Sequence, residues 1–220
     1  MVTEGGVVRW VFGEPPLSQT QDLAAVMRRV IGLATSLERE EDTIEVLVAQ
    51  LVKAERALVD LVPDEARPRV GDDVGSDGRV YLDHARSIGA FNACFPEYQI
   101  QVVGDRATGT VRFPLAYEGP PGLVHGGFIA VFFDCIIQHH NCDVGRAGKT
   151  TSLAVSYRRP TPLGTDLQFS VLRSEDGDRI SSTATLMSEQ LVLCEAEMSA
   201  VAGDRTKLPE VSPRRTGHAL

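Results

Sequence analysis

The sequence lacks an excess of basic residues. Its 220 residues include 30 Asp and Glu against 22 Lys and Arg, which gives a formal net charge of −8 and a pI of about 5.1. A protein that wraps a nucleic-acid backbone neutralises its phosphates with clustered basic side chains. The acidic balance therefore argues against nucleic acid as the partner.

Three further features are missing. The apolar runs fall well short of the roughly 18 residues that suggest a membrane span. The N-terminus has no basic and then apolar segment of the kind that forms a secretory signal. The four cysteines (Cys94, Cys135, Cys142 and Cys194) form no CxxC pair. These absences predict reduced thiols in a cytoplasmic protein without a membrane span.

What remains is an ordinary globular composition, with 43% hydrophobic and 24% charged residues. Residues 18–62 carry apolar side chains at helical spacing, for example Leu23 and Val26, with Arg28 on another face. This pattern predicts a helical hairpin or one long bent helix that packs or dimerises. A stretch rich in Pro, Gly and Asp follows at 63–79, so residues 1–75 are expected to form a helical extension and linker.

Residues 76–203 are predicted to form an α+β domain. The run 126–141 is apolar and too long for a strand, so it is expected to be a largely buried helix. A sheet that wraps this helix is the expected arrangement. Residues 204–220 are expected to be a disordered tail. Extended segments are predicted at 99–103, 107–113, 150–158, 166–173, 179–188 and 191–202.

The candidate chemistry lies at the predicted central helix. His125, Gly126 and Gly127 precede its apolar run, and backbone N–H groups at a helix start are unpaired and favour negative charge. This start could serve as an oxyanion hole. Asp134 follows among apolar neighbours, where a carboxylate is costly unless it is catalytic or paired with Lys or Arg. The sequence therefore leaves a catalytic and a structural role open for Asp134.

These residues, together with the segment Thr150-Thr-Ser-Leu-Ala-Val-Ser-Tyr-Arg-Arg-Pro, resemble the hot-dog-fold acyl-CoA thioesterases. The similarity covers about residues 80–202 and is greatest to the PaaI-like subgroup, which includes 4-hydroxybenzoyl-CoA thioesterase-like proteins. It implies a hydrolase of lipid metabolism that releases a carboxylic acid and coenzyme A. The resemblance makes Asp134 the general base or nucleophile, Gly126 the donor to the thioester carbonyl and Thr150 the hydroxyl that positions water. His125 would support them, and Thr151 is the less favoured hydroxyl.

Substrate contacts are expected around the same segments. Gly127 belongs to the helix start, and Gln138 lies one turn after Asp134 on the same face. Arg158 and Arg159 follow a predicted strand, where they could pair with phosphates of coenzyme A or simply be solvated. Coenzyme A is implied as part of the substrate, with no other cofactor and no metal.

The spacing of the two catalytic groups predicts a dimer. Eight residues at about 1.5 Å each separate Gly126 from Asp134 by roughly 12 Å along one helix. Both groups should lie within about 3 Å of the reacting thioester. Two chains with antiparallel helices would bring them together, so a two-fold homodimer is expected. The resemblance implies this dimer too, and also tetramers.

Two other functions stay open. A non-catalytic acyl-CoA-binding, lipid-binding or assembly protein is suggested by the helical extension and by Gly119, which stands where several relatives have Asn. An enoyl-CoA hydratase or dehydratase of the same fold would use Asp134 and His139. On one helix these two side chains point about 140° apart, which disfavours the hydratase.

Overall fold

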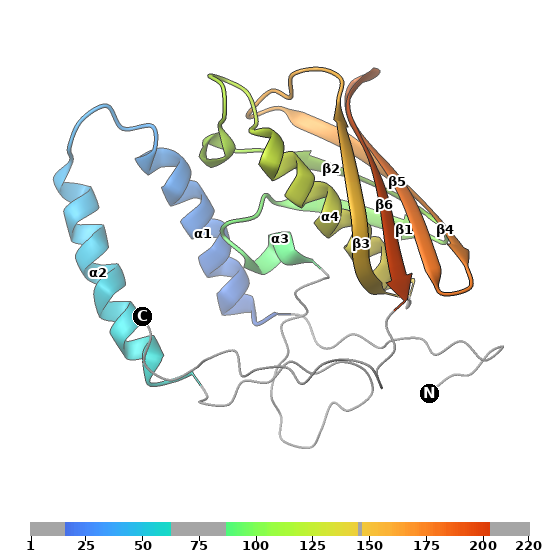
Figure 1. Ribbon diagram of the computed structural model, residues 1–220. Helices are drawn as coiled ribbons and strands as arrows, with labels where there is room; N and C mark the ends of the chain where they lie inside the picture. Colours follow the sequence, from blue (N-terminus) through green and yellow to red (C-terminus); the bar gives the residue numbers. More distant parts are fainter. Residues whose placement is uncertain (1–15, 63–86, 145–146, 203–220) are drawn as a thin grey trace.

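The computed structural model describes residues 16–62, 87–144 and 147–202 (Figure 1). Its centre is a six-stranded sheet in the order β1-β2-β4-β5-β6-β3, with every neighbouring pair antiparallel. The predicted strands are confirmed with small shifts in their ends. The bounds are β1 (Tyr98–Val103), β2 (Arg106–Arg112), β3 (Gly148–Tyr157), β4 (Asp166–Asp176), β5 (Arg179–Ser188) and β6 (Leu191–Ala202).

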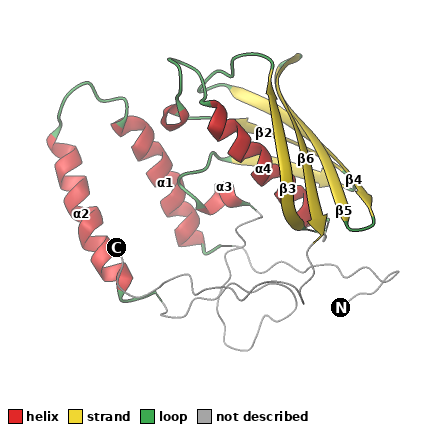
Figure 2. Cartoon of the chain, in the orientation of Figure 1, coloured by secondary structure: helices red, strands yellow, loops and turns green. Residues whose placement is uncertain are grey.

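The long helix α4 (Gly126–Asp143) lies against one face of this sheet, as Figures 1 and 2 show. Strands with alternating burial present their apolar side chains to it, as Leu167, Phe169 and Val171 do on β4. Phe132 and Phe133 of α4 are fully buried in the same cluster. The prediction of an α+β fold with a sheet around a buried helix is therefore confirmed.

The N-terminal region forms two separate helices, α1 (Ser18–Ala34) and α2 (Asp42–Val59), so the alternative of one long bent helix is wrong. α1 lies beside the short helix α3 (Ile88–Phe91) and the 3₁₀ turn η1 (Leu115–Tyr117) (Figure 1). α2 buries none of its residues against the described parts of the chain. The predicted linker at 63–79 lies outside the described residues, and so does the predicted tail at 204–220.

The face that α1 packs inward differs in part from the expected one. Leu23 and Val26 stay about half exposed, Met27 and Val30 of the same apolar stripe are half-buried, and Ala24 and Arg28 are buried. The Arg28 guanidinium donates to the backbone carbonyls of Gly89 at 2.7 Å and of Phe95 at 2.8 Å. The loop around α3 leaves carbonyl groups that need donors, and a forked guanidinium supplies several at once. A polar anchor therefore holds α1 on the domain together with the half-buried part of its apolar stripe.

No helix within residues 16–62, 87–144 and 147–202 is both long enough and apolar enough to span a membrane.

Candidate active site

The start of α4 is built around a histidine cap. His125 precedes the helix in an extended conformation, and its Nδ1 accepts a hydrogen bond from the Gly127 N–H at 3.0 Å. Because Nδ1 is the acceptor, the proton of the neutral imidazole lies on Nε2. The Gly127 N–H is therefore used inside the protein, and His125 acts on the helix start through this cap.

The Gly126 N–H has no acceptor among the described residues. Gly126 lines a cavity of about 380 Å³ together with Arg158 and Arg159. A side chain at Gly126 would come within 3.2 Å of the Tyr157 ring, so glycine permits the close approach in which the Tyr157 hydroxyl donates to the Gly126 carbonyl at 2.8 Å. The helix start thus combines a free N–H donor with two nearby cations.

Both arginines already have partners in the chain. Arg158 Nε lies 2.7 Å from a carboxylate oxygen of Glu195, and Arg159 donates to the Val192 carbonyl at 2.8 Å. These contacts are exposed, and exposed ion pairs are weak enough to exchange with a phosphate ligand. Arg158 and Arg159 both line the cavity at Gly126, and both have exposed contacts that a ligand can replace. Their positions are therefore compatible with phosphate binding.

Asp134 is half-buried on the side of α4 that faces β3. Thr150 Oγ1 donates to Asp134 Oδ1 at 3.0 Å and accepts from Gln138 Nε2 at 2.8 Å. The structure thus joins Asp134, Gln138 and Thr150, three of the residues singled out from sequence. In this arrangement the Gln138 side chain donates a hydrogen bond to Thr150 and not to Asp134.

A β-bulge selects Thr150 over its neighbour. The register with β6 shifts between Thr150, which pairs with Ala200, and Ser152, which pairs with Ser199. Thr151 is the extra residue, and its hydroxyl donates to the Ser199 carbonyl at 3.0 Å. Bulges re-aim side chains next to active sites. Here the bulge lets Thr150 face α4 while Thr151 stays outside the site.

The thiol of Cys135 is adjacent to this carboxylate but is not prepared for nucleophilic chemistry. Burial raises its pKa to about 12, and the negative charge of Asp134 raises it further in the same direction. A thiol acts as a nucleophile only as thiolate. The Cys135 thiol is therefore not available as a nucleophile near neutral pH.

Gly119 is held to glycine by a close backbone approach. A Cβ at this position would lie 2.9 Å from the Cα of His125 and 3.0 Å from its Cβ. An asparagine here would displace the residue that caps α4. The backbone at position 119 therefore packs directly on His125, which leaves no room for a side chain.

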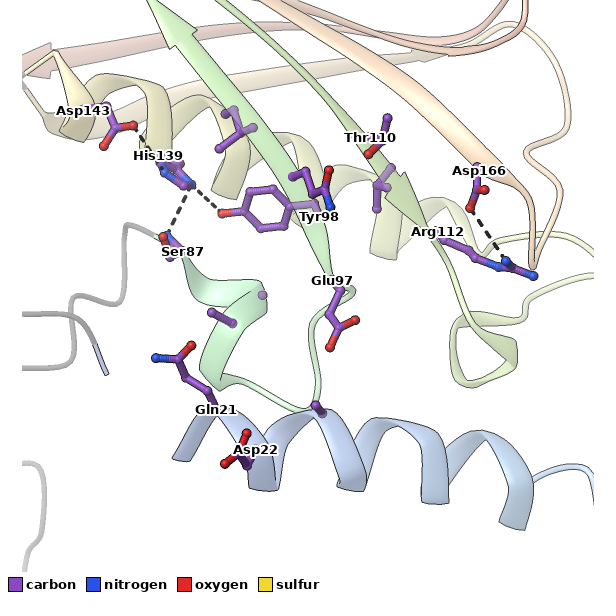
Figure 3. Close-up of a pocket in the computed structure, with 16 residues that line it drawn as sticks. Gln21, Asp22, Ser87, Glu97, Tyr98, Thr110, Arg112, His139, Asp143 and Asp166 are labelled. Carbon is purple, nitrogen blue, oxygen red and sulfur yellow. Dashed lines mark hydrogen bonds and ion pairs between the residues drawn. The ribbon is translucent and has the colours of Figure 1, made fainter. Parts of the chain in front are cut away.

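A larger cavity of about 690 Å³ lies elsewhere, between α1, α3, β1 and β2 (Figure 3). At one end His139 Nδ1 meets the Tyr98 hydroxyl at 2.7 Å and the Ser87 N–H at 3.3 Å, and its Nε2 lies 3.6 Å from Asp143 (Figure 3). His139 thus faces this cavity, whereas Asp134 faces Thr150. The pair that a hydratase would need is not brought together.

No protein-family model matches the sequence. Among solved structures, a crystal structure of a thioesterase superfamily protein aligns over 86% of this chain and 97% of its own, at 29% identity and a TM-score of 0.70. The chain has the hot-dog fold of the thioesterase superfamily. The aligned 86% of the 220 residues is longer than residues 76–220 together. The alignment therefore also includes part of the region before residue 76.

Other solved structures align less closely. The protein smu.793 from Streptococcus mutans, solved bound to acetyl-CoA, has 15% identity and a TM-score of 0.46, and covers 60% of this chain and 97% of its own. The PaaI protein of E. coli has 14% identity and a TM-score of 0.44, with coverages of 47% and 82%. The assignment to the hot-dog fold depends on the first alignment.

Two residues in hydrogen-bond contact with the candidate site were missed from sequence. Asn141 and Arg173 continue the hydrogen-bonded chain that begins at Asp134. A signal for both existed. Asn141 lies seven residues after Asp134, on the same helix face, and Arg173 follows Val171 at the spacing that puts it on the buried side of β4. A cation at a buried strand position requires a partner.

Proposed function

We propose that this chain is an acyl-CoA thioester hydrolase that acts as a two-fold dimer. The observation that carries the proposal is the Asp134 carboxylate, set in an apolar helix and held by the Thr150 hydroxyl at 3.0 Å. A part-buried carboxylate oriented by one hydrogen bond is suited to take a proton from water or to attack a carbonyl. The free Gly126 N–H supplies the electrophilic half of such a site.

The reaction follows from these two groups. The Gly126 N–H of one chain polarises the thioester carbonyl, and Asp134 of the other takes a proton from water while the water oxygen attacks the carbonyl carbon. The tetrahedral intermediate then breaks its C–S bond, and the proton held by Asp134 passes to the leaving sulfur, which releases coenzyme A as the thiol and restores the carboxylate. In the nucleophilic variant Asp134 attacks the carbonyl carbon and expels the coenzyme A thiolate, and water then hydrolyses the resulting anhydride, supplying a proton to the thiolate and restoring Asp134.

The surfaces that would meet in the dimer lie beside the site. β3 ends the described sheet, so one of its edges can pair with another strand. On α4, Phe128 is 40% exposed and Val131 is 52% exposed, and Tyr157 at the end of β3 is 53% exposed. Large apolar side chains gathered around an open strand edge are typical of an interface. Antiparallel contact of two α4 helices there would bring Gly126 of one chain toward Asp134 of the other.

The test is a thiol-release screen over acyl-CoAs from acetyl to long-chain and aromatic, with Asp134→Asn beside the wild type. This change keeps the shape and removes the base, so kcat should fall at least about 10²-fold. Asp143→Asn is the matched control, because it makes the same change on the same helix away from Thr150. Near-normal turnover by Asp134→Asn would end the proposal. Tight acyl-CoA binding without thiol release would favour a binding protein instead.

A mixing experiment tests the shared site. Gly126→Pro removes the N–H at the first helical position, where the backbone tolerates proline, and His125 already has the extended conformation that proline requires before it. The new Cβ would lie 3.2 Å from the Tyr157 ring, so the ring must shift by a few tenths of an ångström and the folding of the variant is checked by circular dichroism. Neither Gly126→Pro nor Asp134→Asn should be active alone. Unfolding and refolding them together should restore about a quarter of wild-type activity, since half of the dimers would be mixed and each would keep one intact site. No recovery would mean that each site lies within one chain.

A further inference from the structure

A buried line of hydrogen bonds connects Asp134 to a guanidinium on β4. Arg173 Nε donates to Asn141 Oδ1 at 2.7 Å, and Asn141 Nδ2 donates to Gln138 Oε1 at 3.3 Å. Gln138 Nε2 donates to Thr150 Oγ1 at 2.8 Å, and Thr150 Oγ1 donates to Asp134 Oδ1 at 3.0 Å. The line crosses from β4 through α4 to β3 and back to α4.

The chemistry of its two ends fixes its direction. A guanidinium can only donate hydrogen bonds, and an ionised carboxylate can only accept them. Each amide between them must accept on its oxygen and donate from its nitrogen, which also fixes the orientation of the Asn141 and Gln138 side chains. The Thr150 hydroxyl must then give its single proton to Asp134. All four bonds point the same way, and bonds in series polarise one another.

The line is well placed to hold this direction. Asn141 is fully buried and Arg173 is 7% exposed, so water competes little for them. Asp134, Gln138 and Asn141 share one face of α4 because they are spaced by four and three residues. Arg173 also forms an ion pair with Glu175, two residues along β4. The guanidinium is thus anchored at its far side while it donates toward the site.

We infer that Gln138, Asn141 and Arg173 are positioning residues for Asp134, which they serve by forcing the Thr150 hydroxyl to donate to its carboxylate. The inference rests on the proposed function, because it assigns these residues to the same site. Thr150 then orients Asp134 Oδ1 and leaves the second carboxylate oxygen for the reacting water or thioester. Since its proton is already given, Thr150 can accept a hydrogen bond from that water but cannot donate one to it.

The titratable groups near the line keep one charge state near neutral pH. His140 interacts electrostatically with Arg173, and burial holds the pKa of its imidazole below the usual 6.5, so it is neutral there. Cys135, next to Asp134 on α4, keeps its proton because burial raises its pKa to about 12. Arg173 stays charged. Met198 of β6 lies 3.9 Å from both Gln138 Nε2 and Thr150 Oγ1 and is neutral. Glu175 pairs with Arg173 at the far end of the line.

The decisive variant is Asn141→Asp in the full chain. The carboxylate introduced there still accepts from Arg173, but it cannot donate to Gln138. The Gln138 amide should turn its NH₂ group toward position 141 and present its oxygen to Thr150, which would draw the Thr150 proton away from Asp134. Because a donated hydrogen bond favours the charged carboxylate, the acid limb of the kcat/KM pH profile should move up by about one unit. We also expect kcat to fall about 10-fold from the loss of orientation.

Three comparisons separate positioning from mere stability. Asn92→Asp adds the same charge outside the line and keeps the oxygen that accepts from the Cys94 N–H, so its profile should match the wild type. Gln138→Met breaks the line without adding charge and should shift the acid limb in the same direction. In a Thr150→Val background, Asn141→Asp should cause no further shift, because its effect passes through Thr150.

A second readout needs no turnover. In ¹⁵N-labelled wild-type protein the Gln138 side-chain amide protons should show an NOE to the Thr150 side chain, and Asn141→Asp should abolish it. If Asp134→Asn is inactive but Asn141→Asp keeps the wild-type profile and NOE, the inference is wrong and the proposed function stands. The inference is also wrong if Asn141→Asp lowers activity by the same factor in the wild-type and Thr150→Val backgrounds and does not shift the acid limb of the pH profile. If Asp134→Asn stays active, the proposed function fails, and the NOE alone decides the hydrogen-bond direction.

Discussion

Arg28→Met should release α1 from the hot-dog domain. Arg28 is 7% exposed and donates to the carbonyls of Gly89, Asn92 and Phe95, as well as to Glu97. Methionine fills similar space without any donor. The helix then keeps Ala24 as its buried apolar side chain, beside the half-buried Met27 and Val30. The carbonyls of Gly89 and Phe95 lose this donor, whereas the Asn92 carbonyl still accepts from the Phe95 N–H at 3.1 Å.

The magnitude follows from what is left unpaired. Leaving a buried polar group unsatisfied costs about 1–3 kcal/mol, and breaking one side of a buried charged contact costs about 3–5 kcal/mol. Water can reach the Asn92 carbonyl and Glu97, which are not buried, so about 3 kcal/mol is the expected loss. This corresponds to about 10²-fold weaker docking of α1. An undocked helix of 17 residues is marginal in water and should fray.

Hydrogen exchange measured by mass spectrometry checks this prediction. Peptides from residues 18–34 should exchange about 10²-fold faster in Arg28→Met, while peptides from β5 and β6 keep wild-type protection. Arg29→Met, at the exposed neighbouring position, is the matched control and should behave as the wild type. Arg28→Lys should be intermediate because one ammonium cannot reach several carbonyls at once. Equal exchange of residues 18–34 in both methionine variants would refute the anchor.

Two further predictions concern charge. His140 is fully buried and its Nε2 donates to the Gly104 carbonyl at 2.9 Å, and burial holds its pKa below the usual 6.5. The unfolded chain therefore takes up a proton first as pH falls below 6.5, and urea titrations should show the wild type losing up to about 1.4 kcal/mol more than His140→Gln between pH 7.5 and 5.5. Arg158→Gln and Arg159→Gln should each raise KM for an acyl-CoA about 3-fold at low salt with kcat unchanged. The same variants should leave KM for an N-acetylcysteamine thioester, which has no phosphates, at the wild-type value, and a KM that rises equally for both substrates would contradict phosphate binding.

Periodicity predicted the framework because burial controls it. Alternation along 166–173 and the unbroken apolar run from 126 reflect which side chains meet the core, and those patterns survive in the folded chain as β4 and α4. The same reasoning placed the buried face of α1 only in part, since Met27 and Val30 are half-buried but Leu23 and Val26 are not. Apolar spacing pointed to Leu23 and Val26, whereas the structure buries Arg28, because carbonyl groups around α3 decide that contact. Every residue has a backbone carbonyl, so the pattern of side chains does not indicate which carbonyls lack a hydrogen-bond donor.

The candidate site shows the same division between local and long-range information. Asp134 and the helix start were recognisable because each is unusual in its own segment. The choice of Thr150 over Thr151 needs the bulge against β6, and a bulge adds one residue without disturbing composition or local hydrophobicity. Arg173 lies 32 positions after Asn141, and only the packing of α4 on the sheet brings them to 2.7 Å.

Helix α4 presents separate faces to separate tasks, and this limits what a loss of activity can reveal. One face carries Asp134 and Gln138, another turns His139 to the cavity beside α1, and a third leaves Phe128 exposed. A substitution on any face can tilt the helix and lower kcat, so kcat alone cannot assign a role. Recovery of activity on mixing two inactive variants is expected only when their substituted residues belong to one site formed by both chains. A shift of the acid limb of the kcat/KM pH profile is expected only when the substituted residue controls the protonation of Asp134. The role of each face of α4 is therefore assigned by whether its variants change the recovery of activity on mixing or the acid limb of the pH profile.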